Sequence, residues 1–106
     1  TVKVTGDGVG GPNQEFALAA ALELPSNTAL CAIDTDGFDG PTDAAGATVT
    51  TATVNDNEAS AARAALKAND AYSFLDDNAA LMLSTEGATG TNVNDLRVLT
   101  ILTEDT

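Results

Sequence analysis

The stretch "TALCAIDTDGFDGPTDAAGATVT", residues 28–50, decides the fold. Its first part, residues 28–33, is an apolar run bounded by turn signals, which predicts a strand covered on both faces, as in a parallel sheet. Residues 46–54 are rich in β-branched side chains and predict a second strand or an extended segment. The loop between them follows the first strand directly and is dense in aspartate and glycine. A turn, a binding site for a cation or phosphate, or both would explain that loop.

The rest of the chain predicts helices and strands on both sides of this stretch. Residues 1–4 alternate like a short strand, and residues 13–24 read as a helix with Asn13 as its N-cap. A strand, a helix and a strand within about thirty residues fit a right-handed βαβ unit. Further helices are predicted at 55–68 and 69–77, and further strands at 79–85 and, as a buried strand, at 96–102. The sequence therefore predicts one α/β domain over residues 1–106, with a small mixed or parallel sheet flanked by helices.

Composition excludes several classes of function. Four Lys and Arg against sixteen Asp and Glu give a net charge of −12, which argues against nucleic acid or an anionic membrane as partner. Such acidity is typical of a cytosolic protein from a halophile, and the alternative is an ordinary acidic protein. The chain has no histidine, and its single Cys31 lies in an apolar run, so a His-dependent triad and an internal disulfide are both excluded. No long apolar span and no secretory leader is visible, so we expect a cytoplasmic protein.

Three loops are candidates for chemistry, because ligands of open α/β sheets gather beyond the carboxyl ends of strands. Loop 5–13 opens a helix, where Gly8, Gly10 and Gly11 would let a phosphate or carboxylate approach closely, or it is a flexible glycine connector. In loop 34–46, carboxylates suit Mg²⁺ or Ca²⁺, but aspartate also caps helices and makes turns. Gly37 and Gly40 are expected to take positive φ angles there. Loop 85–95 offers polar side chains that orient a ligand or pin the loop.

Three motifs in order carry a resemblance to a known family. They are "GGPNQEFALAAALEL" (10–24), "TDGFDGPTDAAGA" (35–47) and "TGTNVNDLRVL" (89–99), with "NDAYSF" (69–74) between the last two. Together they resemble the MOFRL domain, the C-terminal domain of ATP-dependent glycerate 2-kinases, which are often labelled hydroxypyruvate reductases. The resemblance spans residues 6–102.

The resemblance implies a two-domain enzyme in which a larger N-terminal kinase domain, absent from this chain, faces this domain across a cleft. That enzyme would use ATP and Mg²⁺ to phosphorylate the 2-hydroxyl of D-glycerate, a small hydroxy acid. We expect Asp36 and Asp39 to face the cleft as catalytic residues and as Mg²⁺ ligands, and Asp43 to fix the loop. The matched positions expected to bind substrate or phosphate are Gly10, Gly11, Asn13, Gln14, Glu15, Gly37, Gly40, Asp43, Thr91, Asn92, Asn94 and Asp95.

One position departs from the family pattern. Relatives usually carry Arg after the two glycines, where this chain has Pro12, and Arg would be the natural clamp on a carboxylate or phosphate. Either activity is weakened, another residue substitutes, or the protein has diverged. A stand-alone binding module is therefore the rival hypothesis, and a nicotinamide-dependent reductase is a third that no dinucleotide fingerprint supports. The isolated chain is expected to be inactive and to expose an apolar patch that favours a homo-oligomer.

The acidity generates a prediction about salt. Because the −12 surface repels itself, screening by salt should stabilise the fold. A thermal melting series from low salt to molar KCl should show a rising Tm, and the same series in sorbitol at matched osmolality is the control. A Tm that stays flat in KCl would contradict salt adaptation.

Overall fold

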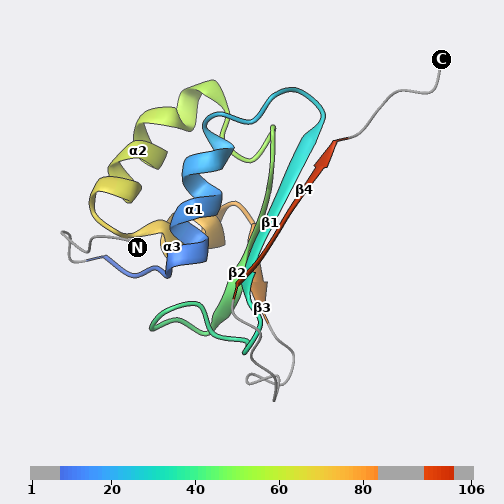
Figure 1. Ribbon diagram of the computed structural model, residues 1–106. Coiled ribbons are helices and arrows are strands. Elements are labelled where there is room, and N and C mark those ends of the chain that lie inside the picture. Colours follow the sequence, from blue (N-terminus) through green and yellow to red (C-terminus); the bar gives the residue numbers. More distant parts are fainter. Residues whose placement is uncertain (1–7, 84–94, 102–106) are drawn as a thin grey trace.

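The computed structural model describes residues 8–83 and 95–101, which form two layers, a sheet and a group of helices on one of its faces (Figure 1). The strands follow the order β3-β2-β1-β4, and every neighbouring pair is antiparallel. Their bounds are Thr28–Asp34 for β1, Ala44–Thr50 for β2, Leu81–Leu83 for β3 and Asp95–Ile101 for β4.

The prediction of a mixed or parallel sheet is therefore wrong for the described strands. The physical reason lies in the connection between β1 and β2. Residues 35–43 contain no helix and are fewer than the dozen or so residues that a parallel crossover needs, so the chain returns beside β1 in the opposite direction. The first strand of the predicted βαβ unit, residues 1–4, lies outside the described residues.

The helices form where the sequence predicts them. A 3₁₀ turn, Asp56–Glu58, precedes α2 and occupies the start of the predicted second helix. Within 8–83 and 95–101, no helix has the length and apolarity to cross a membrane. The bounds are Pro12–Ala21 for α1, Ala59–Lys67 for α2 and Ala71–Asp77 for α3.

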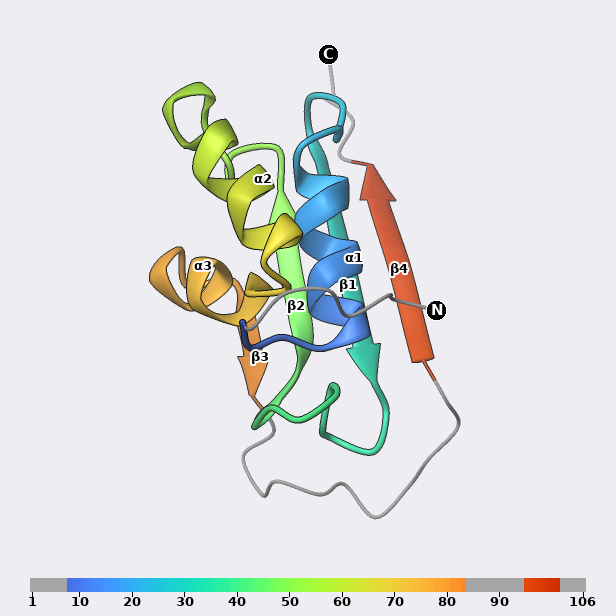
Figure 2. The same ribbon diagram turned by 90° about the vertical axis from the view of Figure 1, so that its left-hand side faces the viewer.

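All these helices lie on the same face of the sheet (Figure 2). On β1 the buried residues Leu30 and Ala32 alternate with Cys31, which is only half-buried on the opposite face. The prediction that β1 is covered on both faces is therefore wrong for the described part of the chain, and the predicted flanking helices lie on one face of the sheet. The apolar run of β1 was misleading because the alternate residues Ala29, Cys31 and Ile33 are also apolar, although no described helix covers them.

The core is thin because most of its members are alanine. Leu18 of α1, Val49 of β2 and Leu75 of α3 are the large apolar side chains that are fully buried. Small side chains let α1 lie close to the sheet, and they leave little apolar area for each element to bury. The fully buried alanines between these elements are Ala17, Ala32, Ala47, Ala62 and Ala71.

The last strand differs from its prediction. Residues 96–102 read as a buried strand, yet all seven residues of β4 are exposed. Two features of the fold explain this. Among the described strands β4 is at the edge, beside β1, and no described helix covers it, since α1 packs over β1 and β2 (Figure 2).

Candidate functional site

A buried carboxylate lies at the start of α1. Asp39 is fully buried, and its Oδ1 accepts hydrogen bonds from the backbone N–H of Asn13 at 2.9 Å and from Asn13 Nδ2 at 3.2 Å. Its Oδ2 accepts the backbone N–H of Gln14 at 2.7 Å. The N-cap residue of α1 is Gly11, which has no side chain to do this, rather than the predicted Asn13. Asp39 therefore caps the helix from a distant loop, with its negative charge at the positive end of the helix dipole.

Glycine makes this contact sterically feasible. A Cβ at Gly11 would overlap the carboxyl group and the carbonyl oxygen of Asp39. Gly40 follows with a φ of 62°, and Gly37 has a φ of 99°, so both take the positive φ angles that the sequence predicted. These angles let the loop fold back so that Asp39 reaches α1.

The capping by Asp39 uses the helix donors that were expected to hold an external anion. The N–H groups of Asn13 and Gln14 bind Asp39, and the N–H of Glu15 donates to the carbonyl oxygen of Gly11 at 3.0 Å. Pro12 has no N–H and occupies the first helical turn, a position that proline favours. Every N–H in the first turn of α1 thus already has an acceptor within the chain.

A polar network joins three parts of the chain at this end of the sheet. Asn13 Nδ2 also donates to Asp95 Oδ1, at 3.0 Å, at the beginning of β4. Gln14 Nε2 donates to Thr42 Oγ1 at 2.7 Å, and that hydroxyl donates to the carbonyl oxygen of Asp39, also at 2.7 Å. The start of α1, the loop after β1 and the start of β4 therefore meet. Thr42 was absent from the predicted site residues, although it lies inside the acidic motif.

Two acceptors of this network have no partner. Asn13 and Gln14 are 1% and 0% exposed, and neither Asn13 Oδ1 nor Gln14 Oε1 has a hydrogen-bond partner in the described part of the chain. Buried polar atoms are normally paired, so an N–H or O–H donor is expected to reach these oxygens when the site is complete.

Asp36 differs from Asp39 in its surroundings. It is half-buried, and its Oδ1 accepts the N–H of Phe38 at 2.9 Å in a local turn. It also lies close to Asp34, whose pKa its negative charge raises, whereas both oxygens of Asp39 accept hydrogen bonds from the start of α1.

Other predicted site residues tie loops to the helices. Asp43 is exposed and accepts a hydrogen bond from the Tyr72 hydroxyl at 2.7 Å, which raises the pKa of Tyr72. Glu15 Oε1 accepts Asn69 Nδ2 at 2.8 Å. A Cβ at Gly10 would lie 3.2 Å from the backbone nitrogen of Ala71, so this glycine also lies against the start of α3. The predicted site residues outside the described residues are Thr91, Asn92 and Asn94.

The electrostatics of the site are those of crowded carboxylates. Burial raises the pKa of Asp39, and the hydrogen bonds from Asn13 and Gln14 partly oppose that rise. Burial also raises the pKa of Asp34, and the negative charges of Asp36 and Asp95 raise it further. Asp34 and Asp95 are direct cross-strand partners in the β1–β4 pair, where like charges repel.

The described residues do not form a metal centre. No group of three or more His, Cys, Asp or Glu side chains among them is placed to hold a metal ion. Both oxygens of Asp39 accept hydrogen bonds from the protein, so this side chain has little capacity left for Mg²⁺. The described geometry therefore gives no support to Mg²⁺ ligation by Asp36 and Asp39.

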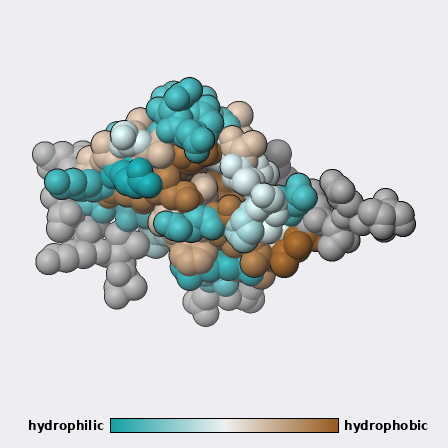
Figure 3. Space-filling model, turned by 90° about the horizontal axis from the view of Figure 1, so that it is seen from above, coloured by the Kyte–Doolittle hydropathy of each residue, from teal (hydrophilic) through white to brown (hydrophobic). Residues whose placement is uncertain are grey.

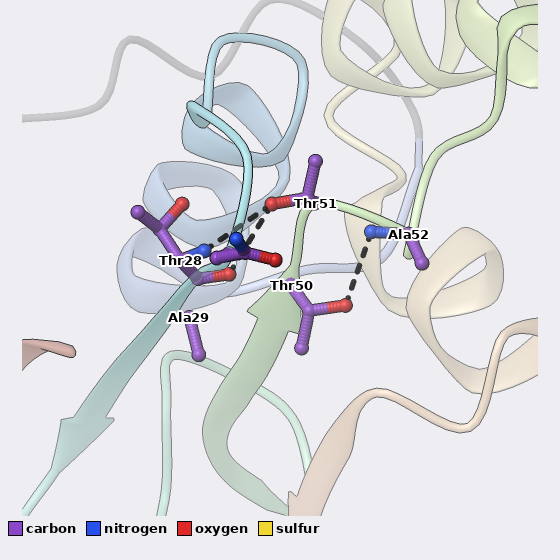
Figure 4. A pocket seen from close by; sticks show the side chains of 6 residues that line it. Thr28, Ala29, Thr50, Thr51 and Ala52 are labelled. Carbon is purple, nitrogen blue, oxygen red and sulfur yellow. Dashed lines mark hydrogen bonds between the residues drawn. The ribbon is translucent and has the colours of Figure 1, made fainter. Parts of the chain in front are cut away.

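A shallow hollow lies at the opposite end of the sheet, where β1 begins and β2 ends (Figure 4). Its polar groups bind one another or the nearby chain: Thr51 Oγ1 donates to the carbonyl oxygen of Pro25 at 2.7 Å, and the N–H of Ala52 donates to Thr50 Oγ1 at 3.1 Å. None of the described residues that line it is charged. The polar network around Asp39, rather than this hollow, is the candidate site. The residues lining the hollow are Asn27, Thr28, Ala29, Thr50, Thr51 and Ala52.

Comparisons with known proteins agree with the motifs. The model of the MOFRL family matches residues 1–95. The D-glycerate 2-kinase of Thermotoga maritima is 48% identical over 99 residues, which cover 90% of this chain and 23% of that protein. The glycerate kinase of Homo sapiens is 40% identical over 109 residues, covering 93% and 21%. The comparisons lend no support to a halophilic origin, which stays a prediction.

Two solved structures share the fold. The crystal structure of glycerate kinase from Thermotoga maritima superimposes with a TM-score of 0.86 at 46% identity, over 96% of this chain and 25% of that one. A crystal structure from Pyrococcus horikoshii gives a TM-score of 0.85 at 36% identity, over 98% and 24%. The chain thus spans about a quarter of the length of these relatives.

The capping contact predicts unequal effects of two matched substitutions. Asp39→Asn replaces one acceptor oxygen by a donor, so a backbone N–H of α1 loses its partner, and we expect a loss of about 1–3 kcal/mol in the free energy of unfolding. Asp36→Asn keeps an oxygen that can accept the N–H of Phe38, so we expect a change below about 0.5 kcal/mol. Urea unfolding followed by circular dichroism measures both. Equal effects of the two substitutions would show that Asp39 is not a cap.

The Asp34–Asp95 pair predicts a dependence on pH. Because the pKa of Asp34 is raised in the folded state, stability from this group is present below its ordinary pKa of 3.8 and is lost as pH rises through the higher folded value. Asp34→Asn should therefore raise stability at pH 7 by about 0.2–1 kcal/mol and give no gain near pH 3. Melting curves from pH 3 to 7 test this. Glu23→Gln, which removes an exposed charge two residues after α1 ends, is the control, and an equal gain in both variants would be a net-charge effect alone.

Proposed function

Because the chain belongs to the MOFRL family, we propose that it is the C-terminal part of a larger glycerate 2-kinase-like enzyme and forms one wall of its interdomain cleft. That enzyme transfers the terminal phosphoryl group of ATP to the 2-hydroxyl of D-glycerate. The observation that carries the proposal is the Asn13 side chain, which binds Asp39 and Asp95 at once. This contact brings the three family motifs together at one end of the sheet.

In this proposal Asp36 and Asp39 have different roles. Asp36 is only half-buried, whereas Asp39 is fully buried, so Asp36 is the carboxylate assigned to the cleft, where it would hold the attacking hydroxyl of the substrate. Asp39 has no exposed surface and acts as a positioning residue, because it fixes the loop that carries Asp36 to the start of α1. Phosphoryl transfer depends chiefly on such positioning and on stabilisation of charge.

The positive charge that phosphoryl transfer needs would come from the larger part of the enzyme. Pro12 supplies no cation and no N–H, and Asp39 already binds the helix donors. Arg97 packs its guanidinium 4.0 Å from the centre of the Phe16 ring. The described residues do not fit a Mg²⁺ site, so no step of the reaction is assigned to a metal held by this domain.

The rival proposal is a binding module that kept the fold and lost the kinase. The occupied start of α1 and Pro12 favour it, since both remove an anion site that the motif suggests. A relative from Agrobacterium vitis, 40% identical over 99 residues, is named a putative hydroxypyruvate reductase, which makes reductase activity a second outcome to test.

Enzyme assays on the longer polypeptide decide among these proposals. With ATP, Mg²⁺ and D-glycerate it should form ADP, and Asp36→Asn should lower kcat about 10²-fold or more without changing Tm, because a carboxylate that handles a proton is lost. The 106-residue chain alone should form no ADP above background. Asp77→Asn, at the exposed end of α3, is the matched control and should keep full activity.

Three results would contradict the proposal in different ways. No turnover of any substrate would favour the binding module. NADH oxidation with hydroxypyruvate, without ADP formation, would favour the reductase. Full activity of the Asp36→Asn variant would remove Asp36 from the reaction and leave the kinase assignment standing.

A further inference from the structure

The composition of β4 conflicts with its exposure. Leu96, Val98, Leu99 and Ile101 are 49%, 45%, 57% and 64% exposed, so both faces of the strand present large apolar side chains to solvent. A strand with apolar residues on both faces is typical of the interior of a covered sheet. Hydrophobic side chains gathered in this way mark an interaction surface.

The exposed side chains continue onto the neighbouring elements. Arg97, Leu99 and Ile101 alternate on the face that bears α1, where Arg97 contacts the Phe16 ring and Phe16 is itself 40% exposed. On the open face, Val98 lies opposite Cys31 in the β1–β4 register. Seen from above, hydrophobic surface gathers where β4 ends (Figure 3). We call this the β4 surface, made of Phe16, Leu96, Val98, Leu99 and Ile101.

The edge of β4 is also available for pairing. β4 pairs only with β1, and no described strand lies on its other side. Exposed edges are usually protected by charge, proline or a bulge, but residues 96–101 contain neither an acid nor a proline, and their only charge is that of Arg97. The net charge of the chain is −12, but the strand residues of the β4 surface include no carboxylate that would repel a second negatively charged polypeptide.

The relatives indicate which partner covers this surface. Two solved structures contain this fold over 96% and 98% of the chain, and it makes up only 25% and 24% of their length. The same fold is therefore attached to a much larger polypeptide in both. A strand added at the edge of β4 would cover that edge with its backbone, and the side chains around it would cover both faces.

We propose that the larger part of the polypeptide docks on the β4 surface and adds a strand to the free edge of β4. Main-chain hydrogen bonds pair with the edge, and apolar side chains beside the new strand cover Leu96 and Val98 on one face and Leu99 and Ile101 on the other. The inference rests on the part of the proposed function that places this chain in a larger polypeptide, and not on the reaction.

This docking would also complete the polar network. β4 begins at Asp95, which binds Asn13, so a strand beside β4 ends next to the site. Donors from the docked part would then lie near Asn13 Oδ1 and Gln14 Oε1, the buried acceptors that lack a partner. The docking surface and the wall of the cleft are thus continuous.

Hydrogen exchange read by mass spectrometry tests the proposal. Amides of residues 95–101 should exchange at least tenfold more slowly in the longer polypeptide than in the 106-residue chain. In the longer polypeptide, Leu99→Lys should abolish this protection, because it places a charge in the covered face. Val9→Lys is the control, since Val9 is 48% exposed on the loop before α1, and it should keep the protection.

Alkylation of Cys31 gives a second measurement that needs no variant. Cys31 lies on the open face opposite Val98, so its alkylation should be slower in the longer polypeptide. Equal exchange and equal alkylation in the two polypeptides would overturn the proposal. Slow exchange of residues 95–101 already present in the 106-residue chain would also overturn the proposal. If that slow exchange depended on protein concentration, the occupant of the β4 surface would be a second copy of the chain. Protection without any glycerate phosphorylation would support the docking surface and contradict only the proposed reaction.

Discussion

The buried carboxylate of Asp39 at the start of α1 is the contact on which this end of the molecule depends. Removing a charge from water is costly, and here three hydrogen bonds and the positive end of a helix offset the cost. The surrounding residues serve this contact: Gly11 leaves the space, and Gly40 lets the chain turn back. In return, the contact fixes the loop after β1 to α1 and so sets the position of Asp36.

The same contact fills the anion-binding position that was expected at the start of α1. A glycine-rich helix start is usually read as a place for a phosphate or carboxylate, but in this protein an internal carboxylate occupies it. The described part of the domain is therefore better suited to position a ligand than to neutralise the negative charge of a phosphate or carboxylate. The net charge of −12 agrees with the proposed function, in which the cations that stabilise a transferring phosphoryl group would come from the larger part of the enzyme.

The described helices cover only one face of the sheet. Helices cover β1 and β2 on one face with a core made largely of alanine, while β4 carries leucine, valine and isoleucine into solvent. Leu18, Val49 and Leu75 are buried in that core, but the large apolar side chains of β4 remain exposed. An alanine-rich core buries little area, so apolar burial at the β4 surface would add substantially to the stability of the longer polypeptide.

The sequence by itself determined the positions of the helices, the strand at residues 28–33, the positive φ angles of Gly37 and Gly40, and the family, through three ordered motifs. It could not determine whether neighbouring strands are parallel or antiparallel, because an apolar run indicates burial but neither the neighbouring strand nor its direction. Nor could it separate Asp36 from Asp39, which are identical in type and three positions apart. Only the tertiary structure decided that one is buried as a helix cap and the other is half-exposed, because that difference depends on a contact with Asn13 and Gln14, far away in the chain. The exposure of β4 also depends on tertiary structure, because α1 packs over β1 and β2 and leaves β4 uncovered. The local sequence of β4 does not reveal this.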